Sequence, residues 1–518
     1  MIPGGAEGAK QRRAGAALSY VSLFVGIVTS FVYVPLLLSF LTTEEYGVYE
    51  LIGSIIAYLS VMDMGLSTTL NRFYVKIKTD GTKRDVENLL AMSGIVYGVL
   101  TVLAVAAGVA VNWAIEPLFG ASFSPLELGL MHQMMVLVIL NCLIILPGNW
   151  FLAIINANER FVFAMALSIF KYIAQLVCVF FILTWHSSAL MVLTAQVFVN
   201  ALCVACYVLY CRQHLRVMCK LHFWDWSLAR NLFSFSFFIL LSMVFDQIFW
   251  KTGQIVLGVV SGASAVASYG IVCRVVVSGF SRISGGISGV FLPRVTLLSA
   301  LSSDMTEINR LFKKIGHLQA ILTWGVCAAF AVLGQEFIYL WAGSEFGDVY
   351  PATLILMLSL CIPFVQSLGL TTLQAKNKMG FRSFTFTIFA VINVIVSIPV
   401  SAKYGVIGCA CVTALVLFIA NGLVLNIYYV KAIGLDVLGL YRKIFPLLIP
   451  IILTSVLTWE VGAILWPDYS WATFVVKCLV FIAVYFCTLF IKGFDSYERS
   501  LLSNVTTKVL ILFRKQSS

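Results

Sequence analysis

Charged residues inside two strongly apolar stretches are the first feature of this sequence that suggests chemistry. The stretches run together from residue 245 to residue 294 and contain Asp246, Lys251, Arg274 and Arg282. An ionisable side chain near the centre of a bilayer costs roughly 2.5–3.5 kcal/mol on insertion scales, so such groups usually face a bundle interior or a watery cavity. These residues therefore either form buried ion pairs that fix helix packing or bind a charged ligand.

Arg274 and Arg282 have the spacing of a binding face on a helix. Together with Ser278 they recur every four residues, and residues four apart share one face of a helix. Two arginines that face one cavity repel each other unless an anion joins them, and the planar guanidinium suits phosphate or carboxylate. We expect these two arginines to bind an anionic group.

Two lysines lie at depth in other apolar runs. Lys171 is about ten residues from either end of its run, too far to reach the membrane interface easily. Lys251 follows Asp246 by five residues, whereas neighbours on a helix face are three or four apart. We therefore expect the partner of Asp246 on another span.

A polar stripe marks the second apolar run. Its members, at a spacing of four within each group, are Glu50, Ser54 and Tyr58, then Asp63, Ser67 and Asn71. Such a stripe is unlikely to be stable against lipid, so it either lines a cavity or joins helices through polar contacts. The candidate substrate-binding residues are Arg72, Lys171, Lys251, Arg274 and Arg282, and the candidate acids, with a coupling or structural role, are Glu50, Asp63 and Asp246.

The composition identifies a polytopic membrane protein. Of the 518 residues, 61% are hydrophobic and only 11% are charged, against about 25% in soluble domains. The net charge of +11 does not indicate nucleic-acid binding, because the basic residues lie in short loops between apolar spans instead of on one soluble face. The apolar run at 14–41 is too long for the core of a signal peptide, so we expect it to remain as the first span.

Apolar runs of about 20 residues, the length that crosses a bilayer, predict an all-α protein with about fourteen transmembrane helices. The runs lie at 14–41, 48–70, 89–112, 130–155, 162–184, 189–211, 232–260, 265–291, 317–342, 351–374, 384–402, 405–430, 444–466 and 471–491.

The lysines and arginines of the connecting segments lie almost entirely on one side of these spans. The opposite loops contain Lys403 but are otherwise acidic, with Glu44, Glu45, Glu116 and Asp348 among them. Cytoplasmic loops hold the excess of Lys and Arg, so both termini are predicted to be cytoplasmic. Lys477 is near the end of the last span, where we expect it to snorkel to the interface.

Weak internal repetition predicts two lobes in parallel orientation. The turn at 45–48, Glu-Tyr-Gly-Val, resembles Ser-Tyr-Gly-Ile at 268–271, and a second pair of similar turns has nearly the same offset. Transporters are often built from such duplicated halves. We predict an N-terminal lobe at 1–215, a C-terminal lobe at 216–435, and two additional spans with a cytoplasmic tail at 436–518.

Sequence signatures of catalysis and cofactor binding are lacking. The chain has no GxxxxGK[ST] phosphate loop, no paired metal-ligand motif and no HExxH helix. The Cys203–Cys206 and Cys409–Cys411 pairs lie in apolar runs and are interpreted as packing residues. We therefore expect no catalytic residues, no metal, no cofactor and no nucleic-acid partner, and we do not expect an enzyme.

Short motifs spread along the chain resemble those of a known family. They are Thr-Glu-Glu-Tyr-Gly-Val-Tyr at 43–49, Asp-Met-Gly-Leu at 63–66 running to Arg72, Asp246, Leu-Gly at 257–258, Tyr-Gly at 269–270, Asn377, and Tyr-Gly-Val-Ile-Gly at 404–408. In order and spacing this pattern is similar to the polysaccharide-transporter flippases, the O-antigen-type branch of the multidrug/oligosaccharidyl-lipid/polysaccharide exporter superfamily.

The resemblance implies two six-helix lobes around a central cavity, with two extra helices. It implies that the protein moves undecaprenyl-diphosphate-linked oligosaccharide from the cytoplasmic to the outer leaflet of the bacterial inner membrane by alternating access, as in O-antigen and lipopolysaccharide synthesis. The basic span residues suit a diphosphate or acidic sugars, and Asp63 or Asp246 would carry a coupling proton or sodium ion. Membrane lipid and a polysaccharide polymerase are the further expected partners.

Three alternatives stay open. A drug or cation antiporter of the same superfamily would typically have twelve spans and an acidic cavity. A flippase for a lipid-linked peptidoglycan precursor has fourteen spans, and only the substrate separates it from the first interpretation. A membrane polysaccharide polymerase or ligase would need a sizeable outside loop with catalytic groups.

Overall fold

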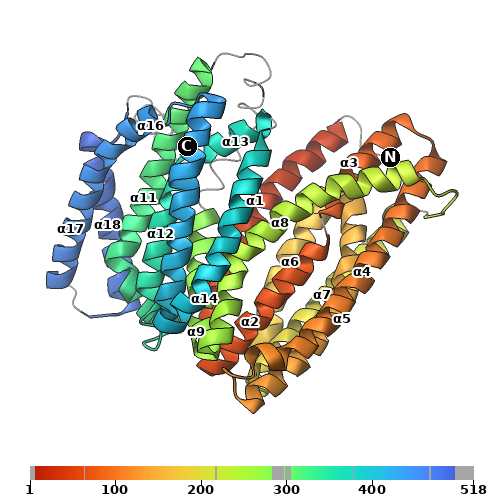
Figure 1. Ribbon diagram of the computed structural model, residues 1–518, viewed down its shortest axis with the longest axis horizontal. Coiled ribbons are helices and arrows are strands. Elements are labelled where there is room, and N and C mark those ends of the chain that lie inside the picture. Colours follow the sequence, from red (N-terminus) through yellow and green to blue (C-terminus); the bar gives the residue numbers. More distant parts are fainter. Residues whose placement is uncertain are drawn as a thin grey trace, which may run out of the picture. The chain divides into compact units, whose positions relative to one another are not determined.

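The computed structural model describes residues 6–63, 65–215, 219–282, 297, 305–376, 378–465 and 468–495. All regular elements in these ranges are helices (Figure 1). Met64 and Asn377 of the sequence motifs, and Arg294 at the end of the charged stretch 245–294, lie outside the described residues. The predicted all-α membrane fold is confirmed.

The chain divides into two compact units. Unit 1 comprises residues 1–274 and 390–409, and unit 2 comprises residues 275–389 and 410–518. Each unit is described by itself below. The lobes at 1–215 and 216–435 were predicted from internal repetition of the sequence, which the division into units does not test. They stay a prediction, as does the additional segment at 436–518.

Unit 1 is built from long helices. In chain order they are α1 (Ala6–Leu38), α2 (Thr43–Ser60), the 3₁₀ turn η1 (Val61–Asp63), α3 (Leu66–Asp80), α4 (Lys83–Phe119), α5 (Pro125–Ala157), α6 (Phe161–Trp185), α7 (Ala189–Tyr210), the π-helical η2 (Cys211–Leu215), α8 (Trp226–Ser261) and α9 (Ala263–Cys273). Capping boxes explain where α4 and α5 begin. The side chain of Thr82 accepts from the N–H of Asp85, Ser124 accepts from that of Glu127, and each acid bonds back to its cap.

Unit 2 contains more broken helices. In chain order they are the π-helical η3 (Arg274–Phe280), which starts at the last residue of unit 1, then α11 (Thr306–Ala342), α12 (Val349–Val365), α13 (Ser367–Ala375), α14 (Met379–Leu417), η4 (Phe418–Val424), α15 (Leu425–Tyr428), η5 (Tyr429–Ile433), α16 (Val437–Ile444), η6 (Phe445–Leu447), α17 (Leu448–Leu465) and α18 (Trp471–Lys492). Residues 390–409 of α14 belong to unit 1.

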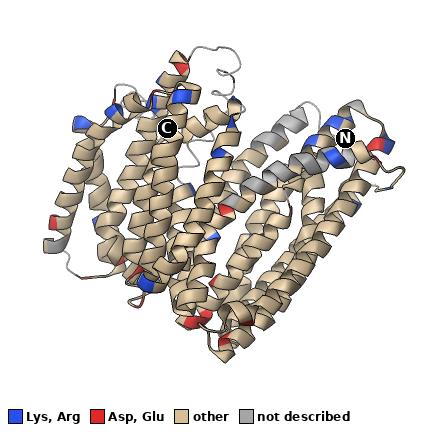
Figure 2. Cartoon of the chain, viewed as in Figure 1, with Lys and Arg blue, Asp and Glu red and all other residues tan. Residues whose placement is uncertain are grey.

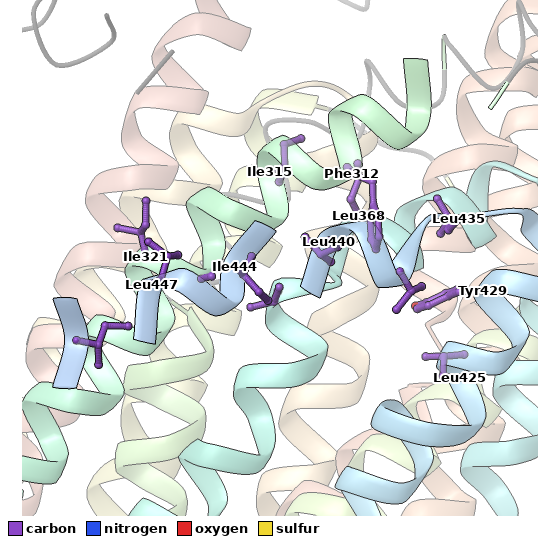
Figure 3. Close-up of a cluster of buried hydrophobic side chains, with 14 of the residues drawn as sticks. Phe312, Ile315, Ile321, Leu368, Leu425, Tyr429, Leu435, Leu440, Ile444 and Leu447 are labelled. Carbon is purple, nitrogen blue, oxygen red and sulfur yellow. The ribbon is translucent and has the colours of Figure 1, made fainter. Parts of the chain in front are cut away.

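An apolar cluster fixes the helices of unit 2 at one end (Figure 3). Phe312 and Ile315 of α11 pack with Leu368 of α13, Tyr429 of η5 and Leu440 of α16, and each of these side chains is at most 2% exposed. The short amphipathic helix α16 is therefore held against α11 through its apolar face, and it leads directly into the membrane-length helix α17.

The helices lie where the spans were predicted, but fewer than the predicted fourteen are counted as candidate spans in the described residues. Eleven helices in the described residues are long and apolar enough to cross a membrane, and α12 and α13, bent by 46°, make a twelfth if taken as one span. The longest of the eleven, Met379–Ile433, has non-helical backbone at Gly405, between the predicted spans at 384–402 and 405–430. Helix α8 covers the predicted seventh span, 232–260.

Charges within each unit gather toward the ends of the helices (Figure 2). Helix α4 of unit 1 begins with Lys83 and Arg84 and has Glu116 near its other end. In unit 2, Lys313 and Lys314 lie in the first turns of α11. This distribution is the one that the positive-inside rule describes.

Candidate functional site

A buried ion pair joins α2 to the end of α9. Arg274 Nη2 donates to Glu50 Oε1 at 2.7 Å, and the side chains of Arg274 and Glu50 are 25% and 7% exposed. Both residues lie in helices of membrane-spanning length. The sequence indicated each residue as a candidate, Glu50 as an acid and Arg274 as an anion ligand, but did not pair them.

Further donors surround the Glu50 carboxylate. Tyr46 Oη donates to Oε1 at 3.1 Å, and Gln254 Nε2 donates to Oε2 at 3.2 Å. A buried ionised pair is tolerated only when additional hydrogen bonds satisfy its remaining polar atoms, and this network supplies them. Glu50 is thus held by donors from its own helix, from α8 and from the end of α9.

Lys251 brings a second cation to this network. Its Nζ donates to Gln254 Oε1 at 3.4 Å, and the same oxygen accepts from Ser54. Gln254 therefore links Lys251 to Glu50 through its two amide atoms. The site holds two cationic side chains, Lys251 and Arg274, and one carboxylate.

Two glycines explain how α2 and α9 approach so closely. A Cβ at Gly47 would lie 2.0 Å from the backbone oxygen of Ala263, and one at Gly270 would lie 2.7 Å from Glu50 Cγ. The turn between α8 and α9 uses Gly262 at φ 81°, a conformation that favours glycine. These small residues allow Arg274 to reach a carboxylate on α2.

The polar stripe of α2 lies at a helix interface over part of its length. Ser54 is fully buried and bonds to Gln254, while Tyr58 bonds to Thr252, two residues earlier on α8. The sequence left two interpretations open for the stripe, which either lines a cavity or joins helices through polar contacts. Ser54 and Tyr58 join helices through polar contacts. Glu50 continues the same interface toward Arg274.

Asp63 forms a separate polar contact on unit 1. It ends the 3₁₀ turn η1 and accepts from Asn149 Nδ2 of α5 at 3.3 Å. Asn149 follows Pro147, which lies inside α5. The side chain of Asp63 is half-buried, and its carboxylate is held by a side chain from a second membrane helix.

The remaining candidates lie on other parts of the helices. Lys171 is half-buried on α6, whereas Arg72 on α3 and Asp246 on α8 are exposed. Arg282 is also exposed and is the last residue described before 297. The π-helical segment η3 lies between Arg274 and Arg282, and the expectation that both arginines share one face stays a prediction.

A second buried ion pair lies in unit 2 and was not predicted. Lys477 Nζ of α18 donates to Glu336 Oε2 of α11 at 2.7 Å, and both side chains are only 6–7% exposed. The expectation that Lys477 snorkels to the interface is wrong, because a buried carboxylate partner holds it inside the unit. Glu336, an acidic residue inside the apolar run at 317–342, is the feature of the sequence that could have indicated this pair.

The described residues contain no group of three or more His, Cys, Asp or Glu side chains that could hold a metal ion. All thirteen cysteines are free, including Cys203, Cys206, Cys409 and Cys411.

Comparison with known sequences decides the family. The family model described as "Polysaccharide biosynthesis protein" matches residues 14–299, more than half of the chain. The chain belongs to this family. A relative from Klebsiella pneumoniae, described as an uncharacterized membrane protein in the cps region, is 24% identical over 262 residues. The match covers 50% of the chain and 52% of the relative, so the chain spans about half the length of the curated relative it matches.

Solved structures show the fold of this family member. The lipid II flippase MurJ in an inward closed conformation has a TM-score of 0.71 at 16% identity, with 94% of this chain and 99% of MurJ covered. An inward-facing multidrug resistance MATE family transporter of the MOP superfamily has a TM-score of 0.61 at 14% identity, with coverages of 81% and 94%. The predicted family is confirmed by the family match, and the predicted fold is confirmed by these structures.

Proposed function

We propose that this family member moves undecaprenyl-diphosphate-linked oligosaccharide units across the bacterial cytoplasmic membrane by alternating access, for the synthesis of a surface polysaccharide. The family match and the flippase-like fold support a transporter of polysaccharide biosynthesis. The observation that supports the substrate class is the cluster of Lys251, Arg274 and Glu50 within membrane helices, because it combines two cations with one carboxylate.

In this proposal the Glu50 carboxylate holds the Arg274 guanidinium when no substrate is bound. The diphosphate of the lipid carrier then competes with Glu50 for the planar fork of Arg274, which suits phosphate oxygens. Lys251 is one hydrogen bond from Gln254 and adds a second positive charge beside the incoming anion. Charge in a membrane interior is expensive unless paired, so the site binds an anionic head group in preference to a neutral one.

The other candidate residues have proposed roles around this core. Lys171, Arg72 and Arg282 would contact phosphates or acidic sugars at other stages of transport. Asp63, Asp246 and Glu50 are the proposed carriers of a coupling proton or sodium ion. In this proposal both termini lie in the cytoplasm, and a polysaccharide polymerase would receive the transported units.

A lipid-linked peptidoglycan precursor is the second candidate substrate. The likeness to the lipid II flippase MurJ, which extends over 94% of the chain, supports it. Both candidate substrates are lipid diphosphates, so the Arg274 cluster would serve either.

Deletion of the gene in its host tests the proposal. We expect loss of the surface polysaccharide, with lipid-linked repeat units accumulating in the inner leaflet, and full recovery when the wild-type chain is expressed. Normal surface polysaccharide in the deletion strain would contradict the proposal. Rescue of cells depleted of their lipid II flippase would instead assign the second substrate.

A further inference from the structure

Unit 2 contains an apolar cavity of about 430 Å³ that has no role in the function proposed above. Its walls come from four helices, with Trp324 and Ala328 on α11, Leu358 on α12, Ile444 on α16 and Ile451 on α17. The volume is within the range of about 300–1,000 Å³ that is typical of ligand pockets. Leu358 is 57% exposed, so one wall continues onto the outer surface of unit 2.

The polar chemistry of this cavity is concentrated at Tyr441. Its hydroxyl oxygen accepts from Gln366 Nε2 at 2.5 Å and from Asn426 Nδ2 at 3.5 Å. Because both amide groups donate to this oxygen, the hydroxyl hydrogen of Tyr441 is left to donate. Ser455, which also lines the cavity, is already bonded to the backbone oxygen of Ile451. The cavity thus has apolar walls and a hydrogen-bond donor at Tyr441.

The surroundings of Tyr441 indicate that a polar group belongs there. Gln366 is 2% exposed and caps α12 at the 46° bend before α13, yet its Oε1 has no hydrogen-bond partner among the described residues. The Oδ1 atom of Asn426 is buried without a partner in the same part of the structure. Buried polar atoms normally have a partner, so this cluster has two unused acceptors beside the Tyr441 hydroxyl, which a hydroxyl group of a lipid head group can satisfy.

A basic residue is next to Tyr441 in the sequence. Arg442 follows it in the last turn of α16 and is exposed. Its neighbour Lys443 is already paired with Asp495 at 2.6 Å. A basic residue at this position would favour an anionic head group at Tyr441, as basic residues at membrane surfaces favour anionic lipids.

The volume of the cavity limits the apolar part of the ligand. A space of about 430 Å³ is near the lower end of the range of ligand pockets, about 300–1,000 Å³. Such a space suits a single acyl chain, whereas most of a long polyprenyl chain would remain outside it.

We propose that this cavity is a binding site for a membrane phospholipid, with one acyl chain between α11, α12 and α17 and its phosphate or ester oxygen bonded to Tyr441. Arg442 contributes the charge that favours an anionic head group. The lipid fills space that would otherwise leave the helices poorly packed, and it stabilises the attachment of α16 and α17 to α11. The proposal does not depend on the transported substrate.

Two native cysteines make the site testable without added labels. Cys327 and Cys361 line the cavity, and Cys361 is 8% exposed. Cys142 of unit 1 is a matched control, because it is 7% exposed and also lies in a membrane helix. The purified full-length chain in detergent micelles would be alkylated with N-ethylmaleimide, with and without phosphatidylglycerol, and labelling of each cysteine followed by peptide mass spectrometry.

We expect phosphatidylglycerol at ten times its Kd to slow labelling of Cys327 and Cys361 by about tenfold and to leave Cys142 unchanged. Ala328→Phe, which fills the cavity, should protect both thiols without lipid. Ala331→Phe offers a second filling variant if the first does not fold. Tyr441→Phe should weaken the protection by phosphatidylglycerol, whereas Tyr339→Phe, at an exposed position of α11, should not.

Two outcomes would overturn the proposal. Equal labelling of Cys361 with and without phosphatidylglycerol, while Ala328→Phe still protects it, would show that the accessible cavity does not bind phospholipid. Protection by undecaprenyl phosphate but not by phosphatidylglycerol would assign the cavity to a polyprenyl chain instead.

Discussion

The two buried ion pairs of this protein have the same length and very different surroundings. Glu50 and Arg274 in unit 1, and Glu336 and Lys477 in unit 2, each meet at 2.7 Å between membrane-length helices. Glu50 also accepts from Tyr46 and Gln254. In contrast, the Oε1 atom of Glu336 is buried and has no hydrogen-bond partner among the described residues.

This contrast indicates different roles for the two pairs. The Glu50–Arg274 pair is suited to exchanging one anionic partner for another, whereas the Glu336–Lys477 pair is suited to holding two helices together. The hydrogen bonds around Glu50 can keep its carboxylate in place when Arg274 turns to another anion, and Lys251 supplies an additional positive charge nearby. Lys477 has one carboxylate partner and lies 5.7 Å from the centre of the Tyr469 ring. We infer that the unit 1 pair belongs to transport and that the unit 2 pair anchors α18 to α11.

The largest effect is expected from removing the arginine of the unit 1 pair. Arg274→Ala should abolish surface polysaccharide while the protein inserts at its normal level, because the anion loses its bidentate donor. Arg282→Ala tests the other predicted arginine in the same way. Surface polysaccharide, lipid-linked intermediates and membrane protein level would be measured in a deletion strain that expresses each variant.

Lys403→Ala is a suitable control for the arginine variants, because Lys403 is an exposed basic residue outside the candidate set. It should leave export unchanged. Normal export by both Arg274→Ala and Arg282→Ala would refute the proposed anion site. Loss of export with Lys403→Ala as well would indicate that export is sensitive to the loss of any positive charge from the protein.

The unit 2 pair should instead affect stability. Lys477→Met leaves Glu336 as an unpaired buried carboxylate, which is expected to cost about 3–5 kcal/mol, whereas the double variant Glu336→Leu/Lys477→Met should be close to neutral. Thermal unfolding of the purified variants would measure the difference, and export by the double variant would remain normal. Loss of export by a stable double variant would give this pair a role in transport and remove the contrast.

Local information explains what could be predicted from the sequence. Hydropathy over about 20 residues located the spans, because the length and polarity of a membrane helix are properties of one segment. The break at Gly405 and the helix starts near Thr82 and Ser124 are likewise determined by nearby residues. The family resemblance gave the superfamily fold, which the matches confirm.

The pairing of charges could not be obtained in the same way. Glu50 and Arg274 are 224 residues apart, and their contact depends on the close approach of α2 and α9 at Gly47 and Gly270. Lys477 was misassigned for a related reason, because its partner Glu336 lies on a distant segment of the chain.

The smallest effect concerns an ion pair outside the predicted spans. Asp436 caps α16, where its carboxylate accepts from the N–H of Gly439 at 2.8 Å and from Lys313 Nζ at 3.0 Å. The backbone bond first, and then the lysine, lower the pKa of Asp436 below its ordinary value of about 3.9. Its side chain is 43% exposed, so solvent screening should keep the contribution of the ion pair to stability below about 1 kcal/mol.

A lowered pKa fixes the direction of the pH dependence. The stabilisation by Asp436 should be fully present above the ordinary pKa of aspartate and be lost as the pH falls through the lower pKa of the folded state. Asp436→Asn keeps a capping side chain but removes the charge. The difference in melting temperature between wild type and this variant should therefore be constant from pH 7 to pH 5 and decrease below about pH 4. A difference that persists unchanged in acid would mean that capping geometry, not the carboxylate charge, stabilises this end of α16. The exposed Asp436–Lys313 pair could then not serve as a comparison for the two buried ion pairs, because its charge would not contribute to stability.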